Sequence, residues 1–438
     1  MKWLLRLALN LVLCMVLAAW IALPALGVAV LAAVLAAALV ATRRGRQALS
    51  VAQVGLSTLT ERLGSSAVIV IGIAGVVGVL VALLAMGEGY RQTLSGTGNE
   101  DTAMVLRGGS GAEVASVLAR DSVVQITDAA GIAHDAGNRP LASPEIVVAA
   151  NLHVRGGLPD DVGSVQLRGV GEQGFAVRPG LHLVEGRRFT PGLRELVVGR
   201  GALRQFDGLQ VGKTVQLGSN PWTVVGVFDS GDAMDSELWG DANVVADAYR
   251  RGASRTSVVA RLQNPAAMNT LKAALADNPQ LSVDATTTLE FYAKQSEGIV
   301  KVLRIIGMVV GSIMGVGAVF GALNTMFAAV AARAREIATL RAIGFGGMPV
   351  VAAILMETLL LALVGGIVGG LVAWILFDGY SASTMAAGSV GKLSFALRVT
   401  PELMWTGIKW ALAIGFIGGL FPAVHAANMS PAAALRQL

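Results

Sequence analysis

The segment Arg333-Ala-Arg-Glu-Ile-Ala-Thr-Leu-Arg-Ala-Ile-Gly344 is short and cationic, and it separates two long apolar runs, 299–330 and 350–377. A membrane-spanning helix needs about 20 mostly apolar residues, so each run is long enough to cross a bilayer. The first run is longer than the bilayer requires, and it is predicted to project beyond one face as a stalk. The segment is therefore predicted to be a loop between two membrane spans.

The composition indicates an integral membrane protein. Of the 438 residues, 54% are hydrophobic and only 14% are charged, whereas a soluble globular protein carries about 25% charged residues. The single cysteine, Cys14, lies inside an apolar run, which excludes a disulfide framework. The N-terminal apolar run has no secretory cleavage pattern and is treated as a retained membrane segment.

Four core spans and an N-terminal hydrophobic pair are predicted. Residues 3–40 are apolar but too long for one span, and Pro24 lies in their middle. Two short spans place the arginines at 43, 44, 46, 333, 335 and 341 all on the cytoplasmic side, as the positive-inside rule requires. A single tilted or re-entrant N-terminal helix is the alternative. The predicted membrane segments are 1–45 (hydrophobic hairpin), 46–87 (amphipathic surface helix and span 1), 298–332 (span 2 with stalk), 349–378 (span 3) and 403–438 (span 4 and cytoplasmic tail).

Charge is divided between compartments. Residues 87–297 carry 19 of the 34 Lys and Arg but 24 of the 29 Asp and Glu, so they are net acidic. The remaining 15 basic residues face only 5 acidic ones and flank the membrane segments. The basic character of the chain thus comes from its membrane borders, and nucleic-acid binding is excluded.

Residues 88–297 are long enough for a folded domain with its own core, and the charge pattern places them outside the cytoplasm. An α/β part is predicted from 88–140 and 250–297, with helices at 112–120 and 265–276 and a late strand at 281–283. A β-rich insert is predicted at 141–249, and residues 379–402 are predicted to be a short outer loop. The fold class is an α-helical membrane protein with a large α+β extracytoplasmic domain of two subdomains.

The sequence motifs that could indicate catalysis, phosphate binding or metal binding are weak. Gly208-Leu-Gln-Val-Gly-Lys-Thr214 resembles a phosphate-binding loop but has three residues between its glycines instead of four. Residues 214–217 and 222–228, which follow it, alternate like the two strands of a hairpin, so 208–214 is predicted to be a turn in a β-domain. The four histidines have no partner at metal-ligand spacing, and the acidic run from Asp229 to Asp241 lacks the pattern of a calcium loop, so it is predicted to be a solvated loop. No catalytic, cofactor or metal residue is assigned.

The chain resembles the permease subunits of the MacB/LolC–LolE/FtsX family, the type VII or mechanotransmission ABC transporters, over roughly residues 46–438. The resemblance is most specific in Arg335-Glu-Ile-Ala-Thr-Leu-Arg-Ala-Ile-Gly344, in Glu357 and in Gly365-Gly-Ile-Val-Gly-Gly370. The ending Asn428-Met-Ser-Pro-Ala-Ala-Ala-Leu-Arg436 and the hairpin 211–228 are also similar to the family. The N-terminal pair departs from it, because family permeases typically have four spans.

The resemblance implies a permease that is not itself an enzyme. A separate cytoplasmic ABC ATPase is expected to bind ATP and Mg, because no nucleotide-binding motif is present in this sequence. A second permease copy in a homodimer, a periplasmic adaptor (a membrane fusion protein) and the lipid bilayer are the other expected partners. The expected location is the cell inner membrane.

The loop 333–348 is then expected to contain the coupling helix. At helical spacing Ile337, Leu340 and Ile343 form an apolar stripe that could enter a groove of the ATPase, and Gly344 would end the helix. An ordinary loop on the lipid headgroups is the alternative. The residues assigned to the coupling helix are Arg333, Arg335, Glu336, Ile337, Thr339, Leu340, Arg341, Ala342, Ile343 and Gly344.

Two polar side chains, Asn324 and Glu357, fall inside predicted spans. Ionisable groups in membranes are functional hypotheses by default, and a polar contact between helices is the other interpretation for Glu357. The spans hold few other polar groups, so no polar channel is predicted. Tripartite efflux of drugs, peptides or other periplasmic substrates with the adaptor is therefore favoured. Lipoprotein extraction and an FtsX-like regulator of cell-wall hydrolases remain alternatives.

Overall fold

A computed structural model describes residues 19–57, 63–158, 160–278, 280–385 and 390–429. The chain divides into two compact units. The membrane unit comprises residues 1–85, 303–378 and 398–438, and the extracytoplasmic unit comprises residues 86–302 and 379–397.

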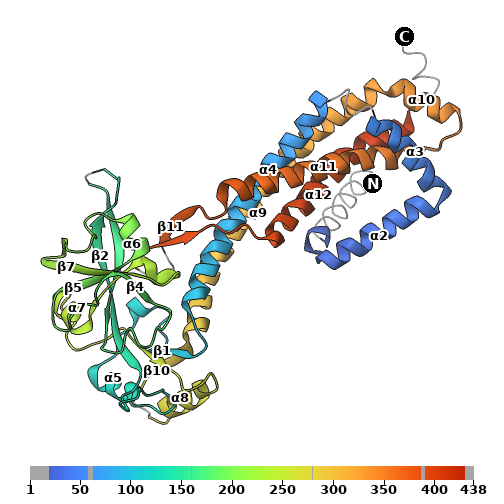
Figure 1. Ribbon diagram of the computed structural model, residues 1–438. Helices are drawn as coiled ribbons and strands as arrows, with labels where there is room; N and C mark the ends of the chain where they lie inside the picture. Colours follow the sequence, from blue (N-terminus) through green and yellow to red (C-terminus); the bar gives the residue numbers. More distant parts are fainter. Residues whose placement is uncertain (1–18, 58–62, 159, 279, 386–389, 430–438) are drawn as a thin grey trace, which may run out of the picture. The chain divides into compact units, whose positions relative to one another are not determined.

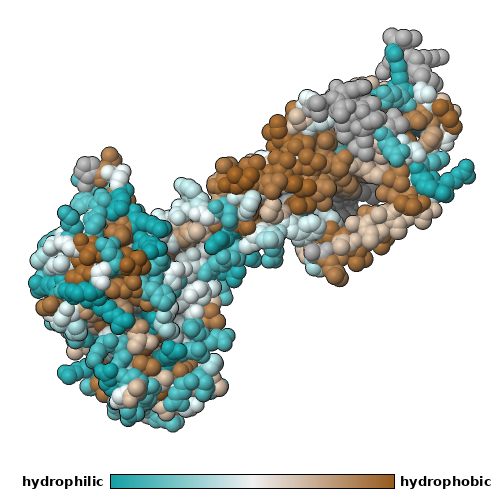
Figure 2. All heavy atoms as spheres, viewed as in Figure 1, coloured by the Kyte–Doolittle hydropathy of each residue, from teal (hydrophilic) through white to brown (hydrophobic). Residues whose placement is uncertain are grey.

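The membrane unit is helical. Four helices are long and apolar enough to cross a membrane, with a bent pair near the N-terminus as a candidate fifth span. Exposed apolar side chains gather over these helices, as a lipid-facing surface requires (Figure 2). The helices that build or enter this unit are α2 (Ala25–Ala41), α3 (Arg43–Ser57), α4 (Leu63–Thr97), α9 (Thr288–Ala332), α10 (Ala334–Ala342), α11 (Gly347–Phe377) and α12 (Pro401–Asn428).

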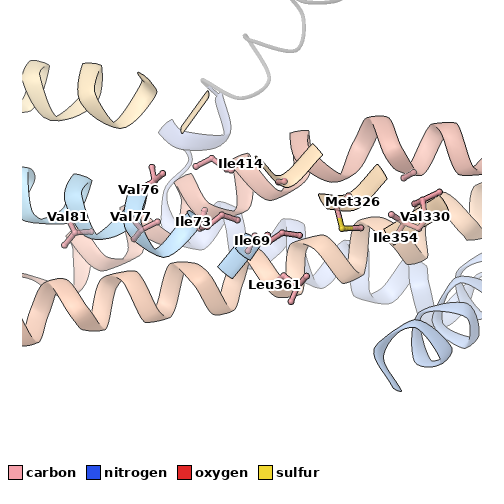
Figure 3. Close-up of a cluster of buried hydrophobic side chains, with 14 of the residues drawn as sticks. Ile69, Ile73, Val76, Val77, Val81, Met326, Val330, Ile354, Leu361 and Ile414 are labelled. Atoms are coloured by element: carbon pink, nitrogen blue, oxygen red, sulfur yellow. The ribbon is translucent and has the colours of Figure 1, made fainter. Parts of the chain in front are cut away.

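The core of the membrane unit is aliphatic and tightly packed (Figure 3). Side chains of α4, α9, α10, α11 and α12 all contribute to it, among them Ile73, Met326 and Ile414. A Cβ atom on Gly365 or Gly369 of α11 would lie 2.9 Å or 2.4 Å from a carbonyl oxygen of α4. The glycine-rich run therefore allows two helix backbones to approach closely.

The N-terminal region is described from residue 19 onward. Helices α2 and α3 meet at a 94° bend, and α3 starts at Arg43, three residues before the segment 46–87 in which the surface helix is predicted. Most of the first crossing of the predicted hairpin lies outside the described residues. The pair of N-terminal spans therefore stays a prediction. Lys409 lies in the third turn of α12. It is buried, and its Nζ donates to the carbonyl oxygens of Ile21 at 2.6 Å and Leu23 at 3.2 Å.

The extracytoplasmic unit is built on one mixed sheet. Its strand order is β10-β1-β9-β2-β3-β8-β5-β7-β4, with β6 paired to β7. The β3–β8 and β5–β7 pairs are parallel, and the other pairs are antiparallel. The strands are β1 (Thr102–Arg107), β2 (Ala142–His153), β3 (Val162–Val170), β4 (His182–Gly186), β5 (Glu195–Gly199), β6 (Thr214–Leu217), β7 (Asn220–Asp229), β8 (Glu237–Asp241), β9 (Ser257–Arg261) and β10 (Val283–Thr287).

Short helices cover the sheet and enclose two main cores. Helices α5 (Arg120–Thr127) and α8 (Ala267–Ala276) pack on β1, β9 and β10. Helices α6 (Arg200–Gln205) and α7 (Ala242–Ala248) pack on the central strands. The long strand β2 contributes to both cores, so the sheet continues across the boundary at residue 141 that the sequence suggests.

Three local predictions were wrong. The helix expected at 112–120 is a 3-10 turn, Glu113–Ala115, and the α-helix starts only at Arg120. The carboxylate of Glu113 is bound by Arg168, which ties this stretch to the sheet. The strand expected at 281–283 is displaced to Val283–Thr287, because it pairs in register with β1. The acidic run is not a solvated loop, since Glu237 and Asp241 are buried.

The outer loop between α11 and α12 also contains structure that the sequence analysis missed. It forms an antiparallel hairpin of β11 (Ser381–Met385) and β12 (Lys392–Ala396). Leu393 and Phe395 alternate with more exposed residues along β12 and are buried. The alternation in Lys392-Leu-Ser-Phe-Ala396 is a strand signal that could have predicted it.

Candidate functional site

The segment 333–344 between the two long apolar runs contains the helix α10. A break at Arg333 (φ −103°, ψ 12°) separates it from the end of α9. Ile337 is buried in the aliphatic core of the membrane unit, and the adjacent Ala338 is also buried. Helix α10 is thus anchored by one face to the bundle.

A specific C-terminal motif ends α10. Gly344 has φ +106°, a conformation that residues with a Cβ avoid. Its N–H donates to the carbonyl of Arg341, and the N–H of Phe345 donates to the carbonyl of Leu340, each at 3.1 Å. This pattern is a Schellman motif, which satisfies the last carbonyls of a helix. The prediction that glycine ends the helix is confirmed at Gly344.

An ion-pair network holds the start of α10. The Arg333 guanidinium contacts Glu357 Oε2 at 3.0 Å and Glu336 Oε2 at 3.2 Å. Only 11% of the Glu357 side chain is exposed, compared with 51% for Glu336. Glu357 of α11 therefore makes a polar contact between helices, which was one of the two predictions for this residue. Its partner is Arg333 at the α9–α10 junction.

Helix α3 completes the base of this site. A small cavity is lined by side chains from three helices. Its lining residues are Val51 and Ala52 of α3, Glu336, Ile337 and Leu340 of α10, Arg333 at the junction, and Val350, Ala353, Ile354 and Glu357 of α11. Any displacement of α10 must also change its packing on α3 and α11.

The outward face of α10 differs from the predicted stripe. Ile337 points into the chain's own core and Leu340 is half-buried, so neither forms a free apolar edge. Ile343 is 72% exposed, and Arg335 and Thr339 are exposed beside it on the helix. The exposed face, which we call the α10 outer face, consists of Arg335, Glu336, Thr339, Ala342, Ile343 and Gly344.

Two other predicted residues differ in their surroundings. The Arg341 guanidinium donates to the backbone carbonyl of Met429, just beyond the end of α12. Arg341 therefore links α10 to α12 within the chain. Asn324 is exposed on α9, and among the described residues it has no hydrogen-bond partner.

A second, larger arginine cluster lies inside the extracytoplasmic unit, and the sequence analysis missed it. Arg168 of β3 is 1% exposed and contacts Glu113 at 2.8 Å, Glu145 at 2.9 Å and Glu237 at 2.7 Å. Arg178 makes a further ion pair with Glu145. The five residues come from segments far apart in the sequence, so no local motif marks them.

Electrostatics stabilise the charged forms in this cluster. Burial alone would raise the pKa of the Glu145 carboxyl, but Arg178 and Arg168 outweigh burial and lower it. Burial would likewise lower the pKa of the Arg168 guanidinium, and the three surrounding glutamates raise it well above its usual value. The pairing in the cluster therefore favours the charged forms of Glu145, Arg168 and Arg178.

The hairpin β11–β12 docks beside this cluster. The N–H of Ser394 donates to Ser236 Oγ at 2.9 Å, and the rings of Tyr90 and Phe395 meet edge to face at 5.5 Å. The N–H of Ala233, close to Ser236, donates to Thr97 Oγ1 at 3.0 Å. The extracytoplasmic parts of α4 and of the α11–α12 connection thus converge on the segment 233–236.

Comparisons with known proteins agree with this architecture. Residues 66–278 match the MacB-like periplasmic core domain, and residues 288–431 match the FtsX-like permease C-terminal domain. The macrolide export ATP-binding/permease protein MacB 1/2 of Paracoccus denitrificans is 27% identical over 84% of this chain and 55% of its own length. The uncharacterized ABC transporter permease YknZ of Bacillus subtilis is 25% identical over 88% of this chain and 98% of its own length.

Two solved structures are similar to part of this chain. The periplasmic region of MacB from Actinobacillus actinomycetemcomitans is 18% identical and matches 46% of this chain and 95% of its own length, with a TM-score of 0.34. The extracellular domain of YknZ from Gram-positive bacteria is 16% identical and matches 42% of this chain and all of its own length, with a TM-score of 0.32. The chain spans a little over half the length of the MacB 1/2 protein that it matches.

Proposed function

The chain belongs to the family of MacB/FtsX-like ABC transporter permeases, and we propose that it converts ATP hydrolysis by a separate cytoplasmic ABC ATPase into motion of its extracytoplasmic unit. In this proposal α10 is the coupling helix, and the α10 outer face is the docking surface. A homodimer of permeases would place two such helices on a pair of ATPase subunits.

The anchoring of α10 carries the proposal. A helix that transmits a displacement from the ATPase to the membrane bundle must be anchored to the bundle on one side. On its other side it must present exposed side chains to the ATPase. The buried Ile337, the Arg333–Glu357 pair and the Schellman end at Gly344 provide the first property. The exposed Ile343 and Arg335 provide the second.

Helix α9 supplies the connection. Its 45 residues run without interruption from Thr288, beside the last strand of the sheet, to Ala332, next to the α10 junction. An α-helix rises 1.5 Å per residue, so α9 measures about 68 Å. Displacing α10 would therefore move a helix that continues into the extracytoplasmic unit.

Efflux with a periplasmic adaptor is the proposed use of this motion. The MacB relatives are named as macrolide export proteins, which supports efflux over lipoprotein extraction. Stimulation of ATP hydrolysis in the assembled complex by erythromycin, measured against a purified lipoprotein, separates the two. A complex that responds to neither and instead activates a cell-wall hydrolase would support the regulatory alternative.

Docking is tested first by photo-crosslinking. With p-benzoylphenylalanine in place of Ile343, irradiation of membranes should give one major adduct that contains an ABC ATPase. The double variant Arg335→Glu, Ile343→Asp should then lose co-purification of that ATPase and its associated ATP hydrolysis. Val124→Asp, a matched change at an exposed apolar residue of the extracytoplasmic unit, should lose neither. Normal assembly of the double variant would refute α10 as the docking site.

A further inference from the structure

Helix α2 ends at an elbow that carries three arginines, which the proposed coupling mechanism does not use. All 17 residues of α2 are apolar, and the helix meets α3 at a 94° bend (Figure 1). Immediately after the bend, the first turn of α3 contains Arg43, Arg44 and Arg46, and all three are exposed. An apolar helix followed by a cationic turn has the polarity profile of the border of a bilayer.

The exposed surface of α2 is apolar. The side chains of Leu26, Val34 and Val40 are 79%, 59% and 66% exposed. At about 1.5 Å per residue, a helix of this length extends about 26 Å, which is close to the roughly 30 Å thickness of the hydrocarbon core. An apolar surface of this extent requires lipid chains or another protein against it.

The segment Arg43–Arg46, which we call the arginine turn, has no acid to balance it. The first 60 residues of the chain contain no Asp or Glu, and among the described residues none of the three arginines has an ion-pair partner. The turn is also the positive end of the α3 dipole. A second copy that offered the same segment would add positive charge instead of offsetting it. The charge therefore favours an anionic group at the end of α2.

Local hydrogen bonds hold the elbow in one geometry. The N–H of Gly45 donates to Thr42 Oγ1 at 2.9 Å, and Thr42 Oγ1 donates to the carbonyl oxygen of Ala38 at 2.8 Å. A Cβ atom on Gly45 would lie 2.6 Å from that carbonyl oxygen, so glycine is needed for α3 to begin this close to α2. The three guanidinium groups are thus gathered on one short, fixed turn.

The other side of α3 packs near α10. Ala52 is buried, whereas Arg43, Arg46 and Ser50 are exposed and share the opposite side of the helix at three- and four-residue spacing. Val51 and Ala52 line the small cavity to which α10 and α11 also contribute. A ligand that holds the arginine turn would therefore restrain a helix that packs against α10.

We propose that the arginine turn binds the phosphate headgroup of an anionic phospholipid whose acyl chains lie along α2. The chains match the exposed apolar side of α2, and guanidinium groups bind phosphate in bidentate geometry. A zwitterionic lipid has the same phosphate but carries its own cation, so it should compete poorly. Binding of the lipid does not depend on the proposed function. An effect of the lipid on coupling, through α3 and α10, rests on that function.

The test uses the full chain in nanodiscs without any ATPase. The probes are photoactivatable phosphatidylglycerol and phosphatidylcholine, each with a diazirine near the start of one acyl chain. After irradiation and proteolysis, mass spectrometry should find phosphatidylglycerol enriched over phosphatidylcholine on peptides of α2 and of the start of α3. Even labelling by both probes along all the membrane helices would overturn the proposal. Unlabelled phosphatidylglycerol should compete, whereas competition by inorganic phosphate would overturn the proposal in favour of a free anion.

Two matched double variants locate the site. Arg43→Gln with Arg46→Gln should lower the preference for phosphatidylglycerol at α3 at least tenfold, because one arginine near an anionic surface contributes about fivefold in affinity, or about 1 kcal/mol. Arg304→Gln with Arg398→Gln removes two exposed arginines elsewhere in the membrane unit and should leave that preference unchanged. Unchanged labelling of α11 and α12 would show that the bundle is intact in both variants. The same preference in both would refute the site.

A crosslinker on α2 separates the lipid from other occupants of this surface. With p-benzoylphenylalanine in place of Val34, adducts should form with lipid alone. An adduct between two copies of the chain, or with the ATPase in the assembled complex, would overturn the proposal.

The outcomes also separate the two proposals. Absence of the lipid preference in a chain that assembles normally with its ATPase would remove the lipid site and leave the coupling function. A lipid preference that persists in a chain that binds no ATPase would do the reverse.

Discussion

Arg168 and Arg333 both bind more than one carboxylate, but they do so in different surroundings. Arg168 is 1% exposed and its three glutamate partners are at most 9% exposed, so the whole cluster is sealed in the extracytoplasmic unit. The Arg333 side chain is 13% exposed at the end of the bundle, and its partner Glu336 is half-exposed. The first network is closed, whereas the second has a partner in contact with solvent.

This difference determines what each network can do. Removing charges from water costs several kcal/mol per ion, and only complete pairing offsets that cost. The Arg168 cluster therefore cannot open without a large penalty, and it fixes the central strands as one body. The Arg333 network can exchange Glu336 for water at little cost. We infer that the Arg168 cluster keeps the extracytoplasmic unit rigid, and that the Arg333 network permits movement of α10.

The largest expected effect follows from Arg168→Met. This change leaves three buried carboxylates with one remaining arginine, and breaking a buried pair in this way costs about 3–5 kcal/mol. Thermal or urea unfolding of the full chain, monitored by tryptophan fluorescence, measures the loss in free energy of unfolding. Trp239 is a suitable reporter because its indole N–H donates to Glu237 in the cluster.

The matched control for that change is Arg155→Met. Arg155 pairs with Asp207 at 3.3 Å in the same unit, and the two side chains are 41% and 58% exposed. Exposed pairs contribute at most about 1 kcal/mol. If both variants lost the same free energy of unfolding, the distinction between closed and open networks would be wrong.

A pH experiment tests the half-buried carboxylate of Asp232, which has no arginine partner among the described residues. Burial raises the pKa of Asp232 to about 6, although Ser230 and the N–H of Met234 donate hydrogen bonds to it. The folded state therefore holds a proton between about pH 4 and 6 that the unfolded chain has released. Stability from this group is present at low pH and is lost as the pH rises through that window.

Asp232→Asn removes this titration and keeps the hydrogen bond to Met234. The variant should gain about 2–3 kcal/mol relative to the native chain between pH 4 and pH 7, given 1.36 kcal/mol per pKa unit. Unfolding curves at several pH values measure the difference. The carboxylates of Glu145 and Glu195, whose pKa values are lowered, titrate in both proteins and cancel. A constant difference across this window would contradict the raised pKa.

Sequence reasoning succeeded where the signal is local. Apolar runs predict the four long helices, and the paired apolar strands around Gly218 predict the β6–β7 hairpin. It failed where partners are distant in the sequence. Glu113, Glu145 and Glu237 look like ordinary surface acids until the fold brings them to Arg168. Ile337 is a similar case. Its position in an amphipathic pattern does not show that its side of α10 packs on the core of the membrane unit.

A smaller effect is expected from Glu357→Gln at the open network. A hydrogen bond to a charged group contributes about 1.5–3 kcal/mol, and Arg333 keeps Glu336 as a partner, so the loss should fall near 1.5 kcal/mol. The helices should remain folded, which circular dichroism would show. Stimulation of ATP hydrolysis by substrate in the assembled complex should fall several-fold. A normal response with Glu357→Gln would mean that the open network takes no part in coupling.

The most local effect is expected at the end of α10. Gly344 has φ +106° and no atom within 4 Å of where a Cβ would lie, so Gly344→Ala tests backbone conformation without a clash. A residue with a Cβ in the left-handed region costs about 1–2 kcal/mol, and that cost should appear as fraying of the last turn of α10. Hydrogen exchange at the N–H groups of Gly344 and Phe345 measures it, and Gly346→Ala, at a position with φ −69°, is the control. If fraying of this single turn also weakens ATPase binding while the Arg168 cluster stays protected from exchange, then docking depends on the stiffness of α10 itself. Unchanged binding would instead assign that stiffness to the Arg333 network at the other end of the helix.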